Sequence, residues 1–289
     1  MTGLRYEAPE TLDAAVALLG GAGGNARVMA GGTDLIIQMD NEMIEPELLV
    51  DIKNIQEMRG IELVDGGYRI GAAVIGMELM EHEDFCATWP GVIEGVSLIG
   101  SIQIKGRATV GGNVCNASPA ADSTPALIAV GATATIMGGG GTREIPVEDI
   151  VTGPGQNSLA DDEIIVTFNF PERPAKSGDA YQRFTPRTEM DIAVVGVGIG
   201  LTLDDDGTCT AARVSLGAVA PKILLVEEAA ATLIGTKVDE AALDNLAKAA
   251  SAACNPIDDK RGTVEFRIDV AGVLARRVAL DALERARKN

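Results

Sequence analysis

The chain has little of several residue types on which common functional sites depend. Its 289 residues include a single histidine, His82, and four cysteines, and only 3% are aromatic. The cysteines form no CxxC pair, and one histidine is too few for an ordinary zinc site. An iron–sulfur cluster held by this chain alone would need all four cysteines to converge. We therefore expect no metal site here and a core made mostly of aliphatic side chains. The cysteines are Cys86, Cys115, Cys209 and Cys254.

Positive charge is also scarce. Lys and Arg total 24 against 42 Asp and Glu, which gives a formal net charge of -18. A chain this acidic repels phosphate backbones, so we expect no nucleic-acid partner. The acidity accounts for solubility, and it could also steer a basic partner subunit.

Long apolar runs are missing. The longest, Asp191 to Leu203, is broken by three glycines, and no run reaches the ~18 residues of a membrane helix. The N-terminus, MTGLRYEAPE, lacks the basic and apolar segments of a signal peptide. We expect no membrane span and a cytoplasmic protein.

The length of the chain favours two domains, because a typical domain has about 150 residues. The best boundary is PERPAKSGD, Pro171 to Asp179, which is rich in proline and charge. We predict domains at 1–174, with subdomains of about 1–55 and 56–174, and at 175–289.

The first part mixes helices with short strands. A helix is expected from Pro9 to Leu19, stopped by Gly20-Gly21, and a hairpin around Asp65-Gly66-Gly67. The Gly138 to Gly141 run is typical of a hairpin tip. Further strands are expected at 27–29, 48–52, 132–137, 143–146 and 163–170, and helices over most of 75–101 and at 124–130.

The second part has strands first and helices after, which implies an α+β domain. Asp204 to Gly207 predicts a hairpin between two strands. The run from Gly196 to Gly200 has part of a GxGxxG spacing, but it lies in a strand pattern with no helix after it. The strands are expected at 192–203 and 208–216, and the helices at 227–234, 240–254 and 268–287.

Two glycine motifs are the best candidates for a ligand-binding site. One is AGGTDL, Ala30 to Leu35, and the other lies in RATVGGNVCNASPAAD, Arg107 to Asp122. Glycine has no Cβ, so a phosphate oxygen can approach the backbone N–H groups directly. Hydroxyl and amide side chains add hydrogen bonds, and a carboxylate suits sugar hydroxyls. We interpret the motifs as two loops that bind a nucleotide with a phosphate and a polyol part.

The two motifs resemble the FAD-binding medium subunits of the molybdenum hydroxylases, the xanthine dehydrogenase and carbon monoxide dehydrogenase family. The similarity extends along the whole chain, through YEAPETLDAAVALL, DDEIIVTFNFP and YQRFTPRTEMDIAVVGVGIGL. It implies a vanillyl-alcohol-oxidase-type FAD-binding fold of two α/β subdomains, with a C-terminal α+β domain closing over the flavin.

The resemblance also implies site residues. The first motif would line the diphosphate and ribityl chain, and the second would form another diphosphate loop. Asp122 would hold sugar hydroxyls, Ile164 and Ile165 would pack on the cofactor, and Arg183 stands where the family often has a lysine near the flavin. The motif residues are Ala30, Gly31, Gly32, Thr33, Asp34, Leu35, Thr109, Gly111, Gly112 and Asn113.

The family has its other cofactors on partner subunits. A small subunit with 2Fe-2S clusters and a large molybdopterin subunit would assemble with this chain as a dimer of heterotrimers. Electrons would pass from the clusters through FAD to NAD, a quinone, a carrier protein or oxygen. We see no acid–base pair in a motif, so we assign no catalytic side chain.

Two other functions stay open at this point. The chain could be a self-sufficient flavin oxidase or reductase, or an assembly subunit that has lost flavin. Gly32→Val and Gly112→Val are predicted to leave a folded chain that no longer binds FAD, because the side chain would occupy the place of the phosphate.

Overall fold

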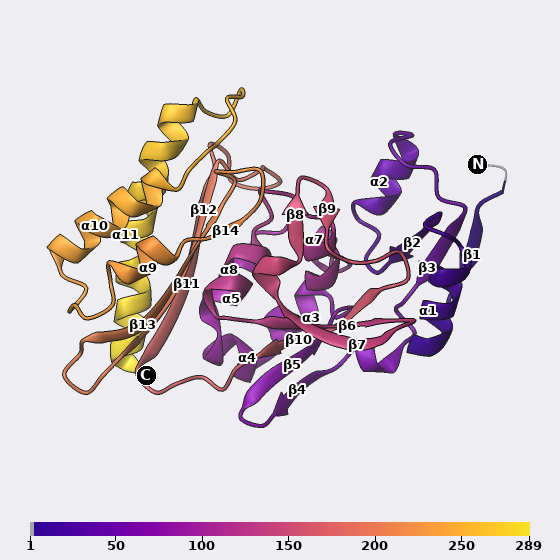
Figure 1. Cartoon of the computed structure of the whole chain (residues 1–289), viewed down its shortest axis with the longest axis horizontal. Coiled ribbons are helices and arrows are strands. Elements are labelled where there is room, and N and C mark those ends of the chain that lie inside the picture. The colour runs from indigo at the N-terminus through magenta and orange to yellow at the C-terminus, as the bar shows by residue number, and fades with distance from the viewer. Residues whose placement is uncertain (1–2) are drawn as a thin grey trace.

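A small parallel sheet with two helices begins the chain (Figure 1). The structure is a computed structural model that describes residues 3–289. Parallel strands need a crossover between them, and here each crossover contains a helix. The strand order is β1-β3-β2, with β1 Arg5–Glu7, β2 Ala26–Met29, β3 Leu48–Asp51, α1 Leu12–Gly21 and α2 Leu35–Asp40.

Helix α1 starts at Leu12, three residues later than expected, and also ends later. Thr11 caps it, because its Oγ1 accepts a hydrogen bond from the Ala14 N–H at 3.3 Å. The prediction that Gly20-Gly21 stops the helix is wrong, since α1 includes both glycines. The chain leaves its helical path only at Gly23, which has a φ of 56°.

A five-stranded antiparallel sheet follows, in the order β4-β5-β10-β6-β7. The hairpin at Asp65-Gly66 is confirmed, and both residues have the positive φ that a tight two-residue turn requires. The Gly138 to Gly141 hairpin is confirmed between β6 and β7. The strands are β4 Ile61–Val64, β5 Gly67–Gly71, β6 Thr133–Gly138, β7 Gly141–Pro146 and β10 Ile164–Phe170.

Short helices and a two-stranded ribbon complete this region. His82 is expected within a helix, but it lies between α3 and α4 and caps α4 by accepting from the Phe85 N–H at 3.2 Å. The elements are η1 Gln56–Met58, α3 Gly76–Glu81, α4 Glu83–Thr88, α5 Pro90–Ser97, α6 Ile102–Lys105, α7 Val110–Cys115, α8 Ser123–Ala129, η2 Val147–Asp149, β8 Val151–Gly153 and β9 Gln156–Asn157.

The C-terminal part is an antiparallel sheet with its long helix packed along it (Figure 1). This confirms the α+β prediction, although strand β11 was not expected and β12 starts three residues later than predicted. The strands are β11 Ser177–Phe184, β12 Val195–Leu203, β13 Cys209–Gly217 and β14 Leu224–Leu225, and the helices are α9 Glu227–Ala231, α10 Glu240–Ala252 and α11 Val264–Lys288.

Helix α8 joins the two parts. It packs on β12 and β13, where the strand has glycines in place of side chains. A Cβ on Gly198 would lie 2.6 Å from the Pro125 carbonyl oxygen, and one on Gly200 would collide with the Ala129 carbonyl. The strand interpretation of this glycine run is therefore confirmed, and its glycines allow close helix packing. None of the helices in residues 3–289 is long and apolar enough to cross a membrane.

Candidate functional site

The two glycine motifs lie against each other. The Arg107 Nε donates to the Gly31 carbonyl at 3.3 Å, between residues 76 positions apart. Gln38 Nε2 donates to Asn116 Oδ1 at 3.1 Å and ties the residues after one motif to those after the other. The structure therefore brings Ala30–Leu35 and Thr109–Asn113 together. We call this pair of motifs the glycine clamp.

The two glycines of each pair have different roles. A Cβ on Gly31 would collide with the Arg107 carbonyl, and one on Gly111 would lie 2.6 Å from the Ala72 carbonyl oxygen. A Cβ on Gly112 would meet only Thr109 Oγ1, at 3.1 Å. Protein backbone therefore occupies the Cβ side of Gly31 and of Gly111, and the missing side chain lets the chain pack closely at both positions.

Gly32 is the other open glycine. The nearest atoms to a Cβ there belong to flexible side chains, with Ile36 Cδ1 at 3.1 Å. Its φ of 74° also lies in the left-handed region that favours glycine. Each motif therefore has one glycine whose Cβ side faces protein backbone and one whose Cβ side faces only side-chain atoms.

Each motif leads into the first turn of a helix. The second, expected as a loop, enters α7, and Thr109 Oγ1 caps it by accepting from the Gly112 N–H at 2.9 Å. The first enters α2, where the Ile36 N–H donates to the Gly32 carbonyl at 3.1 Å. The first N–H groups of a helix have no acceptor within it, and the helix dipole favours an anion there. Two such ends in contact suit a diphosphate.

Two cationic side chains contact the first motif, and neither is among the predicted site residues. Lys53 Nζ donates to the Ala30 carbonyl at 3.2 Å and to Asp51 Oδ2 at 2.6 Å. Arg107 is exposed and forms no ion pair within residues 3–289. Lys53 is 23 positions from Ala30 in the sequence, and Arg107, although it begins the second motif, is 76 positions from Gly31, so both contacts are made by the fold.

Asp34 and Thr33 lie at the mouth of the clamp. Asp34 is exposed and, although it stands at the N-cap of α2, its side chain makes no capping hydrogen bond. Its oxygens are free to accept from hydroxyl groups of a ligand. Thr33 is half-buried beside it, and so is Leu35.

Asp122 belongs to a buried polar cluster. Its Oδ1 accepts from the Tyr181 hydroxyl at 2.8 Å, and its Oδ2 accepts from Arg183 at 2.6 Å. Burial raises the pKa of Asp122 to about 6, although Arg183 and the Tyr181 hydroxyl oppose that rise. Both oxygens already have protein partners, so the carboxylate holds strand β11 to α8 in addition to any contact with a sugar.

Arg183, expected near the flavin, has a side chain that is only 5% exposed. It also donates to the Leu98 carbonyl at 3.3 Å, and its Nε is buried without a partner within the described residues. The cluster connects to the clamp, because the Ser123 hydroxyl donates to Asn113 Oδ1 at 2.7 Å. The structure thus links Asn113, Asp122 and Arg183 through α8.

Ile164 and Ile165, which are expected to pack on the cofactor, have buried side chains. Both lie in the central strand β10 and are 2% and 4% exposed. Neighbouring residues of a strand point to opposite faces of its sheet. The two side chains therefore face different directions within the core and have almost no free surface for a cofactor.

Cys115, which follows the second motif, and Trp89 in the core have structural roles. Burial raises the pKa of the Cys115 thiol to about 12, so it has no thiolate character at neutral pH. Trp89 is buried in the core, with the Arg173 guanidinium 4.9 Å from its ring centre. The clamp therefore supplies open backbone, uncharged hydrogen-bonding groups and positive charge, which fit a cofactor with a diphosphate and a polyol.

Comparison with known families covers both parts of the chain. Residues 2–173 match the FAD binding domain in molybdopterin dehydrogenase, and residues 180–282 match the CO dehydrogenase flavoprotein C-terminal domain.

Similar proteins are known in bacteria. The carbon monoxide dehydrogenase medium chain of Afipia carboxidovorans is 33% identical over 98% of this chain and 97% of its own length. The xanthine dehydrogenase FAD-binding subunit of Escherichia coli is 32% identical over 90% of both chains. A chain in the crystal structure of the Cu,Mo-CO dehydrogenase superimposes with a TM-score of 0.93 at 33% identity, over 98% of both chains.

Proposed function

The chain belongs to the family of FAD-binding subunits of the molybdenum hydroxylases, and we propose that the glycine clamp is where it holds FAD. It is an electron-transfer flavoprotein subunit of a heteromeric oxidoreductase. Its complex has iron–sulfur and molybdopterin groups on partner subunits. The family match also confirms the expected fold class.

The open glycines are the observation that supports the binding proposal most directly. In this proposal the N–H groups at the starts of α2 and α7 bind the diphosphate, with Arg107 close by to balance its charge. Thr33 and Asp34 bind hydroxyls of the ribityl chain. Asn113 is held by Ser123 next to them.

Flavin accepts and releases electrons singly or in pairs, which lets it link one-electron clusters to a two-electron acceptor. We propose a dimer of heterotrimers in the cytoplasm, with NAD, a quinone, a carrier protein or oxygen as acceptor. We also propose that residues 1–174 bind FAD and that 175–289 form a separate domain beside it. Two clusters of buried hydrophobic residues support this division. The first consists of residues between 15 and 170 together with Ile223, and the second consists of residues between 180 and 286.

Gly112→Val tests the clamp. Valine has a higher helix propensity than glycine, so we expect a folded protein. We expect FAD affinity to fall at least about 100-fold, equal to ~2.7 kcal/mol, because the side chain would fill the place of the phosphate. Absorbance of the purified chain and fluorescence titration with FAD measure the effect. Gly32→Val is a weaker test, because its φ of 74° strains any side chain.

Gly140→Val is the matched control, since a Cβ there meets nothing within 4 Å. It should bind FAD like the wild type, at about one FAD per chain. Wild-type affinity in Gly112→Val would refute the clamp, and a wild-type chain unable to bind FAD would refute the proposed function.

A further inference from the structure

Helix α11 leaves a row of apolar side chains in water. It packs on β11, β12 and α10 through its other face, and Figure 1 shows it in the outer layer of the C-terminal part. On the outer side, Phe266, Val273 and Leu280 are 42%, 52% and 46% exposed. Residues seven apart lie almost on one line of a helix, because two turns contain about 7.2 residues. The three side chains therefore form a row about 21 Å long.

A neighbouring strand extends the row at one end. Phe184 of β11 is 37% exposed, and its ring meets the ring of Phe266 edge to face, with the ring centres 5.7 Å apart. Single exposed apolar residues are common on proteins, but apolar residues that join into one surface are typical of interaction sites. We call this surface, with the charged residues between its apolar side chains, the α11 face.

The charges of the α11 face are arranged around Val273. Asp269 lies four residues before Val273 and Arg277 four residues after it, and both are exposed without an ion pair within residues 3–289. Glu284, further along the helix, pairs with Lys288. The helix has six basic and four acidic residues, whereas the whole chain has a net charge of -18. This face therefore lacks the excess negative charge that makes the chain as a whole repel a second copy.

We propose that the α11 face is a contact between two copies of this chain, with the two helices antiparallel and a two-fold axis at Val273. Phe266 of each copy then lies beside Leu280 of the other, since both are seven residues from Val273. Asp269 comes within reach of the long side chain of Arg277 of the second copy. A parallel arrangement would instead place Asp269 against Asp269, so charge selects the antiparallel one.

The arrangement of the face about Val273 favours a second copy over a different protein as the occupant. In both directions from Val273 the sequence has a charge after four residues and an apolar side chain after seven, and the two charges are opposite. A two-fold contact requires such self-complementarity, because each pair of residues meets twice. A partner of different sequence places no such condition on this chain. The contact uses neither FAD nor another subunit, so it goes beyond the proposed function.

Val273→Asp tests the contact, because residue 273 of both copies lies at the axis. Half of the Val273 side chain is in water, so we expect folding and FAD content to stay unchanged. Sedimentation equilibrium of the purified full-length wild-type chain should show monomer and dimer at concentrations up to about 100 µM. The dissociation constant of the dimer should rise at least about 100-fold in the variant, since two carboxylates would face each other. Leu63→Asp, at a side chain of β4 that is 67% exposed, is the matched control and should dimerise like the wild type.

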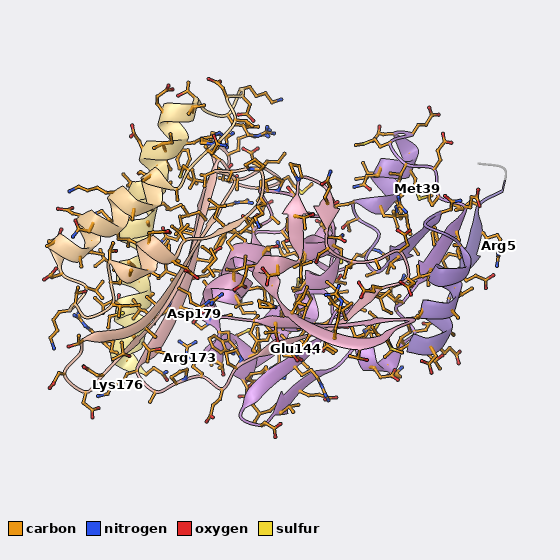
Figure 2. All side chains as sticks on the ribbon, in the orientation of Figure 1. Arg5, Met39, Glu144, Arg173, Lys176 and Asp179 are labelled. Carbon is orange, nitrogen blue, oxygen red and sulfur yellow. The ribbon has the colours of Figure 1, made fainter. Side chains whose placement is uncertain are left out.

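Exchange of the two charges tests the antiparallel geometry. Arg277→Asp should weaken the dimer about tenfold, because the new carboxylate lies near Asp269 of the second copy. The double variant Asp269→Arg/Arg277→Asp reverses the pair and should return the dissociation constant to within about threefold of the wild-type value. Arg5→Asp changes the net charge by the same amount as Arg277→Asp, but Figure 2 places Arg5 at the edge of the molecule opposite α11, so this control should not affect the dimer.

Four results would overturn the proposal. The first two are a wild-type chain that stays monomeric up to about 100 µM and a Val273→Asp dimer of wild-type strength. The third is a double charge variant that dimerises as weakly as Arg277→Asp. The fourth is loss of iron or molybdenum from the native complex of Val273→Asp, which would assign the face to a partner subunit. The FAD content of the same samples tests the proposed function separately, so the two failures are distinguishable.

Discussion

At the residue scale, the paired glycines show how far a motif can be interpreted before its neighbours are known. The sequence pattern predicts that AGGTDL and TVGGN meet, and the Arg107–Gly31 contact agrees with that. The pattern does not show at which glycine of each pair a side chain would collide with the protein. That depends on residues distant in sequence, such as Ala72, whose backbone lies where a Cβ of Gly111 would be. Lys53 was missed for the same reason.

Asp122 predicts a pH dependence of stability. Its folded pKa of about 6 lies above the ordinary value of 3.8, so the native state binds more protons than the unfolded state between these values. The free energy of unfolding should therefore fall as pH rises from about 4 to 6, by up to about 1.4 kcal/mol per pH unit from this group. Asp122→Asn should remove that part of the slope in urea unfolding followed by circular dichroism.

Asp34→Asn serves as the control, since it removes an exposed carboxylate. Equal slopes for the wild type and Asp122→Asn between pH 4 and 6 would contradict the assignment of the Asp122 pKa. Asp179, whose pKa burial also raises, contributes to the slope in all three proteins.

At the scale of elements, local signals predicted the hairpins and the long helices well. Asp-Gly turns between strand-like runs determine the hairpins β4–β5 and β12–β13, and apolar residues at helical spacing determine the long helices. Helix α7 could not be predicted, because two glycines in six residues give a low helix propensity. Capping by Thr109 and packing against Ala72 stabilise it, and the second of these is a tertiary contact.

The packing of α8 on β12 gives a prediction about stability. Gly198→Ala would place a Cβ 2.6 Å from the Pro125 carbonyl oxygen. Overpacking of this kind costs about 1–3 kcal/mol. Thermal unfolding should show a lower Tm for Gly198→Ala and an unchanged Tm for Gly140→Ala, which lies in open space. An unchanged Tm in both would mean that the helix and strand are not in close contact.

At the scale of the whole molecule, ion pairs join the C-terminal sheet and helix to the elements that precede them. Arg285 of α11 pairs with Glu94 of α5, and Arg213 of β13 pairs with Glu148 at 2.5 Å. Asp179 accepts from the Gly91 N–H at 2.7 Å in the buried interior. The fold class and family were predictable from sequence, but these long-range pairs were not. The domain boundary near residue 175 stays a prediction.

The most direct test of the central claim is the ratio of FAD, iron and molybdenum to this chain in the native complex. Purification through a tag on this chain, followed by flavin release and metal analysis, gives all three ratios. We predict about one FAD per chain, with iron and molybdenum held by separate polypeptides of the same complex. Iron and molybdenum present without flavin, or flavin present without either metal, would contradict the assignment of this chain as the electron-transferring flavin subunit.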